Sequence, residues 1–507
     1  MLDLGRSFLS SVERSPQSIA IVDGDVRLSY ANWMSRISAL ADGLASLGLK
    51  RGDHVLVVMQ NRWQMATLHW ACQFLGLIVT PINWRSKRDE IEYCAVDAQA
   101  RAIVYDESGA EAVAASPACY NIPRIVTFQP IGDEIAFDEL LNAHGMEGML
   151  HANAEDWSIM LYTSGTTGRP KGVPRKHRAE RAAAIAHIAQ NQYSMGERTL
   201  GVMPLYHTMG VRSLLSMALV NGCFVCMPRF DATEALKLIG RERISHLYLV
   251  PTLYHDLLAD EGFRDADISS VRRLGFAGAS MPEGLLRRLD DAFRPDLFVN
   301  HYGSSEIFTF SFDQAATEKP GSAGRAGLNA RIRVVTLGTT HPDDLAAPGE
   351  EGQIIADLNS DEAFEGYWNR PEADARSRKH GWYFTGDTGH FDQDGDLFVT
   401  GRVDDMIVSG GENISPVEIE SILSLHEAVD EVAVAGLADD RWGQKVVAFV
   451  KRKSEVDPET LDVFCRSSEL FNFKRPKEYV FVRKIPKSSV GKILRRKLVA
   501  GDYERDE

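Results

Sequence analysis

A glycine- and threonine-rich segment, YTSGTTGRPKGV at residues 162–173, separates the apolar stretch SIML at 158–161 from an alanine-rich helical segment. Glycines let the backbone approach a ligand closely, Ser and Thr hydroxyls donate hydrogen bonds, and Lys171 adds a positive charge. The segment therefore predicts an anion-binding loop between a strand and a helix. It is not a P-loop, because Gly168 is followed by Arg-Pro-Lys rather than by Lys and Ser or Thr.

Short apolar runs rich in β-branched residues alternate with amphipathic stretches on both sides of this loop. They are VLVVM at 55–59, AIVY at 102–105, RIVTF at 124–128, FVCM at 224–227 and HLYLV at 246–250. Strands that alternate with helices are typical of parallel, doubly wound α/β sheets. Residues 331–357 differ, with two strand-like runs around a Gly/Pro/Asp loop, which predicts a hairpin or barrel-like β structure. From Gly401 the pattern restarts as a compact α+β unit.

The length of 507 residues is about three times the ~150 residues expected of one domain, so more than one core is expected. We predict an α/β protein with two domains. Residues 1–403 form a large N-terminal domain of stacked α/β sheets with a small β-barrel-like part. Residues 404–507 form a small α+β C-terminal domain.

The charge balance limits the classes of partner. Lys and Arg number 56 and Asp and Glu 71, a net charge of −15, which disfavours general binding to nucleic acids or anionic membranes. The segment 474–498 is an exception, because it holds ten basic residues and one acidic residue, Glu478. On charge alone this segment is a solvated surface or a localisation-like basic tract.

Cysteine usage and hydropathy favour a cytoplasmic protein. Six cysteines are too few for a disulfide framework, and the pair Cys223 and Cys226 lies in an apolar run that predicts a buried strand. The N-terminus has no long apolar region of a secretory signal. Residues 65–82 are too short and too often interrupted to span a membrane, and they predict a core helix followed by a short strand.

Four further motifs accompany the glycine-rich loop. They are YGSSE at 302–306, WYFTGD at 382–387, GRVDDMIVSGGENISPVEIE at 401–420 and PKSSVGKILRR at 486–496. With them the whole chain resembles the adenylate-forming superfamily of acyl-CoA synthetases, adenylation domains and luciferase. It is most similar to aryl-CoA ligases of the 4-chlorobenzoate type, on MPLYH at 203–207, FAGASMP at 276–282, RWGQ at 441–444, CRSSEL at 465–470 and FKRPK at 473–477.

The resemblance implies a CoA ligase that uses ATP, Mg²⁺ and coenzyme A. A carboxylate attacks the α-phosphorus of ATP, which releases pyrophosphate and gives an acyl-adenylate. The CoA thiol then attacks the acyl carbonyl, which releases AMP and gives the acyl-CoA thioester. Attack of an anion on an anion needs compensating charge, since unit charges at 4 Å repel by about 4 kcal/mol at an effective dielectric constant of 20. The residues implied to hold ATP and its metal are Thr163, Ser164, Gly165, Thr166, Thr167, Gly168, Lys171, Ala279, Ser280, Tyr302, Ser305, Glu306, Asp387 and Arg402.

Several of these residues have individual implied roles. Glu306 is the Mg²⁺ ligand, a hard oxygen donor suited to that ion. Asp387 accepts hydrogen bonds from the ribose hydroxyls, with Arg402 assisting, while Ala279 and Ser280 flank the adenine. Lys492 is the catalytic lysine that bridges the substrate carboxylate and the α-phosphate.

The small domain is implied to rotate about a hinge at Asp404 between the two half-reactions. Rotation would withdraw Lys492 and bring the CoA-side residues to the pantetheine tunnel. These residues are Arg85, Gly410, Gly411, Trp442, Phe473, Arg475 and Lys477.

The acid is implied to be lined by Ile185, His207, Thr208, Met209, Tyr248, Ala279, His301, Gly303, Phe308 and Thr309. His207 matches a gate at the mouth and is counted among the catalytic residues. His301 stands where the chlorobenzoate-type ligase has an aliphatic residue, so it either reads a polar group of the acid or is a structural histidine. Tyr248 and Phe308 suggest a flat, compact acid such as a benzoate or a furoate, while a short or alicyclic acid stays open.

Two other functions compete with this interpretation. A stand-alone adenylation enzyme would load a carrier-protein thiol and would not need Arg475 and Lys477. A non-catalytic scaffold would not need Glu306, Asp387 and Lys492. The expected partner is a small carboxylic acid, without nucleic acid or membrane, and a homodimer stays open.

Overall fold

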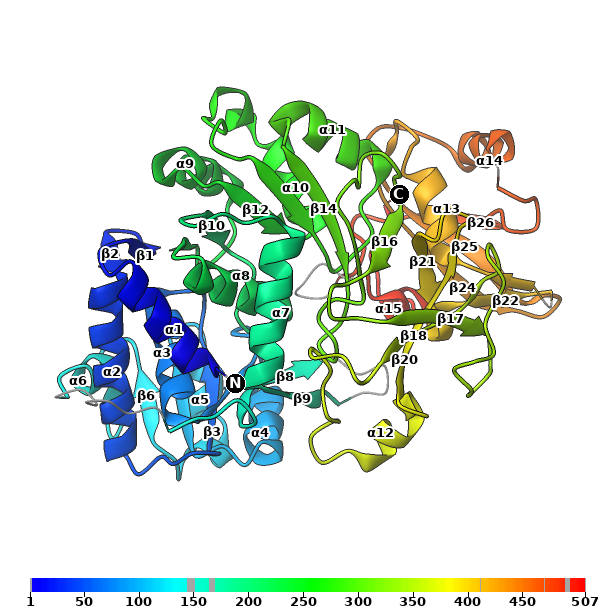
Figure 1. Ribbon diagram of the computed structural model, residues 1–507. Coiled ribbons are helices and arrows are strands. Elements are labelled where there is room, and N and C mark those ends of the chain that lie inside the picture. Colours follow the sequence, from blue (N-terminus) through cyan, green and yellow to red (C-terminus); the bar gives the residue numbers. More distant parts are fainter. Residues whose placement is uncertain are drawn as a thin grey trace.

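Three β-sheets organise the chain (Figure 1). The structure is a computed structural model that describes residues 2–143, 151–163, 169–410, 412–468, 470–487 and 493–506. Predicted positions Ser164, Gly165, Thr166, Thr167, Gly168, Gly411 and Lys492 lie outside these residues.

The first sheet has the order β7-β6-β5-β3-β4-β8-β9. Its strands are β3 (His54–Val58), β4 (Ile78–Pro81), β5 (Ala102–Tyr105), β6 (Arg124–Val126), β7 (Ile135–Ala136), β8 (Trp157–Thr163) and β9 (Lys171–Lys176). All neighbours are parallel except β8 and β9, whose antiparallel register pairs Thr163 with Lys171. The predicted anion-binding loop therefore joins two adjacent strands, with the alanine-rich helix α7 (His177–Gln190) after the second.

The largest sheet has the order β17-β18-β20-β21-β16-β15-β14-β13-β12-β10-β11-β1-β2, with β19 beside β20. Its strands are β1 (Ile19–Asp23), β2 (Val26–Ser29), β10 (Arg198–Gly201), β11 (Cys223–Cys226), β12 (His246–Leu249), β13 (Arg273–Phe276), β14 (Leu297–Tyr302), β15 (Ser311–Asp313), β16 (Ser322–Ala326), β17 (Ile332–Thr336), β18 (Gly352–Asp357), β19 (Arg378–Lys379), β20 (Trp382–Phe391) and β21 (Leu397–Arg402). The six neighbouring strands β1, β11, β10, β12, β13 and β14 run parallel to one another. Beyond β14, the pairs β14–β15 and β15–β16 are antiparallel. The predicted β hairpin at 331–357 is confirmed as β17 and β18.

A separate third sheet follows the short turn η3 (Val403–Asp405). Its strands are β22 (Ile407–Ser409), β23 (Glu412–Ile414), β24 (Val429–Asp439), β25 (Gly443–Arg452) and β26 (Glu478–Phe481). Helices α13 (Pro416–Leu423), α14 (Pro458–Ser467) and α15 (Arg495–Val499) accompany it, and it has a hydrophobic core of its own. This is the α+β unit expected from the sequence pattern.

The other helices belong to the two large sheets. They are α1 (Leu4–Arg14), α2 (Tyr30–Ser46), α3 (Trp63–Leu75), α4 (Arg88–Asp97), α5 (Ala110–Ala114), α6 (Phe137–Leu140), α8 (Thr208–Leu219), α9 (Ala232–Glu242), α10 (Pro251–Ala259), α11 (Glu283–Phe293) and α12 (Pro371–Ser377), with the short turns η1 (Pro117–Cys119) and η2 (Glu261–Asp265).

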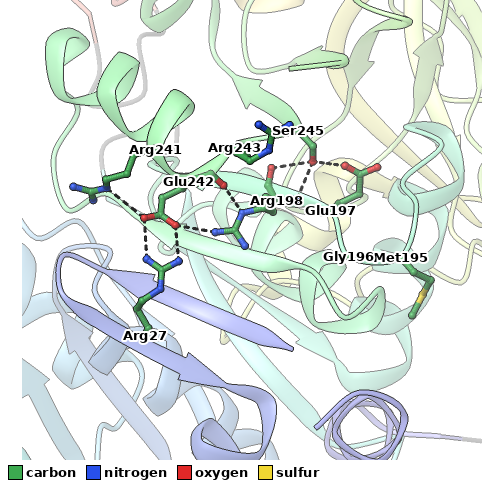
Figure 2. Close-up of a pocket in the computed structure, with 9 residues that line it drawn as sticks. All are labelled: Arg27, Met195, Gly196, Glu197, Arg198, Arg241, Glu242, Arg243 and Ser245. Atoms are coloured by element: carbon green, nitrogen blue, oxygen red, sulfur yellow. Dashed lines mark hydrogen bonds and ion pairs between the residues drawn. The ribbon is translucent and has the colours of Figure 1, made fainter. Parts of the chain in front are cut away.

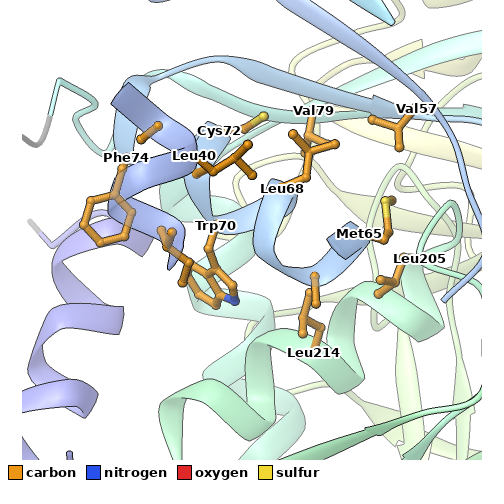
Figure 3. Close-up of a cluster of buried hydrophobic side chains, with 14 of the residues drawn as sticks. Leu40, Val57, Met65, Leu68, Trp70, Cys72, Phe74, Val79, Leu205 and Leu214 are labelled. Carbon is orange, nitrogen blue, oxygen red and sulfur yellow. The ribbon is translucent and has the colours of Figure 1, made fainter. Parts of the chain in front are cut away.

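Helix α3 confirms the predicted core helix. It is buried on every side, with Val57 and Val79 of the first sheet on one side and Leu214 of α8 on another (Figure 3). A helix that is apolar all round belongs in the core between layers. Cys223 and Cys226 are buried in β11, as predicted, and burial raises the pKa of the Cys223 thiol to about 11. Within the described residues, no helix is long and apolar enough to cross a membrane.

Candidate active site

Tyr302, Asp387 and Arg402 meet although the sequence spreads them over one hundred residues. Tyr302 ends β14 and donates from its hydroxyl to Oδ2 of Asp387 at 2.6 Å. Asp387 pairs with Arg402 in the β20–β21 ladder, and Arg402 Nη1 donates to Oδ1 of Asp387 at 2.8 Å. Burial raises the pKa of Tyr302 well above its ordinary value, so its hydroxyl stays a donor. The carboxylate is thus anchored as a fixed hydrogen-bond acceptor at the carboxyl end of a parallel strand, where α/β sheets bind ligands.

Glu306 lies on a tight turn directly after β14. The turn is closed by the Ser304 amide, which donates to the Ile307 carbonyl at 2.9 Å, and by the Ser304 hydroxyl, which accepts from the Glu306 amide at 3.2 Å. A side chain at Gly303 would place its Cβ 1.6 Å from the Phe308 carbonyl oxygen, so this position requires glycine. The Glu306 carboxylate is 7% exposed and accepts from the Tyr367 hydroxyl at 2.7 Å.

Lys171, the first residue of β9, lies near Glu306, because both contact Tyr367. Its Nζ lies 4.2 Å from the centre of the Tyr367 ring, a cation–π contact. Thr163 at the end of β8 donates weakly to the Lys171 carbonyl at 3.5 Å. The flanks of the predicted anion-binding loop therefore lie beside the glutamate that the resemblance assigns to the metal.

The donor set suits Mg²⁺. This ion keeps several waters and binds one or two carboxylates together with substrate phosphates, so a lone glutamate beside Ser304 and Ser305 is sufficient. A cluster of three carboxylates in the described chain, Asp392, Asp394 and Asp396, lies elsewhere. The ammonium of Lys319 donates to all three at 2.6–2.9 Å, so a lysine offsets part of the negative charge of that cluster.

Ala279 and Ser280 lie just after β13, at the same edge of the sheet. Both are exposed, and the neighbouring Gly278 adopts a positive φ of 85°. The segment reaches the acyl side as well, because a Cβ at Gly278 would lie 3.8 Å from the Met209 sulfur. Adenine and acyl positions predicted from the sequence are therefore adjacent.

Several of the predicted acyl-binding residues lie in one buried cluster of rings. Tyr248 and His301 pack edge to face with ring centres 5.4 Å apart, and both are more than 95% buried. Met209 and Phe308 belong to the same hydrophobic core as Tyr248. The Thr309 amide donates to Glu362 at 3.1 Å. The cluster lies between β12, β14 and the end of α7.

Three further predicted positions belong to α7 and to the start of α8. His207 precedes α8 and Thr208 begins it, and the His207 ring lies 4.6 Å from the ring of Tyr206. Ile185 on α7 is 43% exposed and lies outside the packed cluster.

His187 of α7 and Asn191, which caps that helix, were missed from the sequence. His187 is completely buried, with its ring centre 4.7 Å from Tyr248, 5.1 Å from His301 and 5.7 Å from Phe308. Asn191 caps the helix and contacts His187 and His301. Their spacing of four residues, which places both on one helix face, is the signal that could have found them.

A buried charge network behind the Glu306 turn was also missed. Arg175 of β9 and Arg212 of α8 both pair with Glu180 of α7, and all three side chains are at most 1% exposed. Glu362, buried beside them, accepts from the Thr309 amide. Buried charges must be paired, so this network ties the two large sheets and α7 to the site.

The predicted CoA residues lie on two different units. Arg85 follows β4 of the first sheet and stacks on Trp84 at 3.7 Å. The other described ones belong to the unit built on the third sheet, where Gly410 has a positive φ of 61° and a Cβ there would lie 2.9 Å from the Trp442 ring. Phe473 is 44% exposed and stacks on Phe471.

The two predicted CoA-side cations that follow the third sheet's strand β25 differ in their surroundings. The guanidinium of Arg475 donates to Asp462 at 2.7 Å, and its side chain is 18% exposed. Lys477 is exposed. Lys477 therefore has the more accessible positive charge of the two.

A surface pocket of about 470 Å³ lies at the opposite edge of the large sheet, where β10 and β12 begin (Figure 2). Arg27 donates to both oxygens of Glu242 at 2.9 Å, and Arg198 donates to the same carboxylate at 2.9 Å. These ion pairs join β2, β10 and α9. Its place at the amino ends of the parallel strands separates it from the site around Asp387 and Glu306.

The chain is similar to known proteins in both sequence and structure. The chain matches the AMP-binding enzyme family over residues 8–368 and the AMP-binding enzyme C-terminal domain over residues 418–492. The 4-chlorobenzoate–CoA ligase of Arthrobacter sp is 33% identical over 494 residues, which cover 96% of this chain and 93% of the relative. The long-chain-fatty-acid–CoA ligase FadD13 of Mycobacterium tuberculosis is 32% identical over 501 residues, 98% and 97% of the two chains. The structure of o-succinylbenzoate CoA synthetase (MenE) from Bacillus subtilis, in complex with the acyl-adenylate intermediate OSB-AMP, superposes with a TM-score of 0.84 at 26% identity and covers 99% of each chain.

Proposed function

The chain belongs to the family of AMP-binding enzymes and is an AMP-forming acid–thiol ligase that uses ATP and CoA, and we propose that its acid is a small aromatic or heteroaromatic carboxylic acid. The observation that carries this proposal is the cluster of rings at the acyl position. Tyr248, His301 and Phe308 surround His187 with ring centres within 5.7 Å of it. Ring systems that pack edge to face favour a flat aromatic guest over a flexible chain.

In the first half-reaction, charged side chains are proposed to hold ATP and to offset the charge of its phosphates. Asp387, held by Tyr302 and Arg402, accepts hydrogen bonds from the ribose of ATP. Lys171 offsets phosphate charge from the flank of the glycine-rich loop. Glu306 would hold Mg²⁺, which would neutralise further phosphate charge when bound. Lys492, outside the described residues, is assigned to the carboxylate and the α-phosphate from the sequence motif.

In the second half-reaction the third-sheet unit is proposed to rotate about Asp404. This residue is exposed in η3, between the last strand of the large sheet and the first strand of the third. A short exposed turn between separately packed cores is suited to absorb a change of backbone angles. Arg85, Trp442, Phe473, Arg475 and Lys477 are proposed to hold the nucleotide part of CoA.

The test is a screen for pyrophosphate release over aromatic, heteroaromatic and short aliphatic acids, with CoA or a carrier protein as acceptor. We expect the highest kcat/KM with a benzoate-like or furoate-like acid and thioester formation with CoA. A preference for aliphatic or alicyclic acids would overturn the proposed substrate class. Thioester formation only on a carrier protein would overturn the proposed acceptor. Lys492→Ala should abolish pyrophosphate release while leaving CoA transfer from supplied acyl-adenylate.

A further inference from the structure

We propose that the acyl pocket selects an acid whose ring carries a hydrogen-bond donor, a hydroxyl, an amino group or a ring N–H, placed against Nδ1 of His301. This inference rests on the proposed function and narrows its substrate class. It follows from the hydrogen bonds of Asn191, which determine which nitrogen of the His301 ring carries the proton.

The side-chain amide of Asn191 has only one possible orientation. Its Nδ2 donates to the main-chain carbonyl of His187 at 2.8 Å, and a carbonyl oxygen can only accept. The other end of the amide is therefore Oδ1. The same Nδ2 lies 3.1 Å from Nδ1 of His187, which accepts its second hydrogen bond.

The orientation of Asn191 decides the tautomer of His301. Nε2 of His301 lies 3.2 Å from Asn191 Oδ1, which only accepts, so Nε2 must carry the proton. Burial lowers the pKa of His301 to about 3, and the ring is therefore neutral near pH 7. A neutral imidazole holds one proton, so Nδ1 of His301 is a bare acceptor.

Nδ1 of His301 is buried and has no hydrogen-bond partner in the described structure. Leaving a buried polar atom unpaired is costly, and such an atom is expected to find a partner in a ligand or a water. The hydroxyl groups of Tyr248 and Thr309, both among the predicted acyl-binding residues, are also buried and unpartnered. A ring hydroxyl can donate to the imidazole nitrogen and can also accept from a protein hydroxyl.

A halogen or an ether at the same place would not satisfy the acceptor. Neither can donate to Nδ1 of His301, and each would displace any water that does. A site built to bind a hydroxyl or an N–H discriminates strongly against an analogue that lacks it. The surroundings of His301 therefore favour a donor substituent over an apolar one.

The experiment measures pyrophosphate release with matched benzoates. Hydroxy and amino acids are compared with fluoro, methyl and unsubstituted acids at each ring position, with pyrrole-2-carboxylate against furoate as the heteroaromatic pair. We expect a donor-bearing acid to exceed its fluoro or furan counterpart by about tenfold or more in kcat/KM. Turnover of these acids without any donor preference would overturn this inference and leave the ligase assignment intact. Failure to activate any aromatic acid would instead overturn the proposed function.

Variants locate the preference at His301. His301→Leu should reduce the ratio of kcat/KM between donor-bearing and fluoro acids to near one. Asn191→Leu should lower the same ratio, because the proton of His301 is then no longer held on Nε2. His54→Leu is the matched control, because His54 is a buried histidine on β3 whose Nε2 is also unpartnered. Its ratio should equal that of the wild type. An unchanged ratio in His301→Leu would overturn the inference. If that variant does not fold, an unchanged ratio in Asn191→Leu, or no donor preference of the wild type, would overturn it instead.

Discussion

Arg175 donates from Nη1 to the main-chain carbonyl of Glu306 at 3.0 Å, although its side chain is completely buried. The same nitrogen donates to the Ser305 carbonyl at 3.1 Å. Glu180 balances the charge of this arginine and also pairs with Arg212. A strand of the first sheet thus holds, from behind, the turn that carries the proposed metal ligand.

Replacing Arg175 by Met should lower the free energy of unfolding by about 3–5 kcal/mol, because Glu180 and Glu362 lose a buried counter-charge. Urea unfolding measures this loss. Arg178→Met is the control, since Arg178 pairs with Glu155 and Glu365 on the surface and should change stability by less than about 1 kcal/mol. Equal losses in the two variants would contradict the role of the buried network.

Replacing Asp387 by Asn should raise the KM for ATP by about tenfold or more, because hydrogen bonds to a charged group contribute about 1.5–3 kcal/mol. Tyr302→Phe removes only one of the groups that hold the carboxylate, and it should have a smaller effect of the same kind. Steady-state kinetics with ATP varied measures both. An unchanged KM in Asp387→Asn would argue against ribose binding at this carboxylate.

Replacing Asp404 by Pro should slow thioester formation more than adenylation, because proline restricts the backbone of the exposed turn η3. Asp404→Ala removes the same carboxylate but leaves the backbone free, so it should behave like the wild type. The two half-reactions are compared as pyrophosphate release and as CoA transfer from supplied acyl-adenylate. If the proline variant slows both equally, the hinge lies elsewhere.

Acid should destabilise the fold through its buried histidines. Burial lowers the pKa to about 3 for His69, His246 and His301 and to about 4 for His54 and His177, against about 6.5 in an unfolded chain. Between these values the unfolded state binds more protons. Stability is therefore fully present above pH 6.5 and falls below it by up to about 1.4 kcal/mol per pH unit for each histidine.

Urea unfolding at pH 7.5 and pH 5.5 measures this dependence. His54→Gln should reduce the difference between the two pH values by the share of one histidine. Stability that is equal at both pH values would show that these imidazoles are not buried in the neutral form.

Replacing Lys319 by Met should lower the melting temperature, because Asp392, Asp394 and Asp396 would repel each other without its ammonium. Added salt should restore part of the loss, since ions screen exposed charges. Lys237→Met is the control, because Lys237 only approaches Glu234 at 3.9 Å on an exposed helix face. A salt-independent loss in Lys319→Met would point to lost packing.

Much of the site could be predicted from the sequence because its chemistry is carried by short motifs. Gly303 is obligatory where the turn closes on Phe308, and Gly386, directly before Asp387, adopts a positive φ of 78°. The core helix α3 could be predicted as well, because burial on all sides requires a continuous apolar run. Constraints of this kind depend on residues that are neighbours in the sequence, so the sequence shows them directly.

The rest depended on residues far apart in the chain. Arg175, Glu180 and Arg212 would be read as surface charges, and only packing of β9, α7 and α8 makes them a buried network. His187 and Asn191 look like ordinary members of an alanine-rich helix.

The sequence by itself determined the enzyme family and pointed to the motifs proposed to bind the nucleotide, since each motif consists of residues close together in the chain. Only the tertiary structure decided the state of His301. Its tautomer depends on Asn191, 110 residues away, because burial removes the water that would otherwise satisfy either nitrogen.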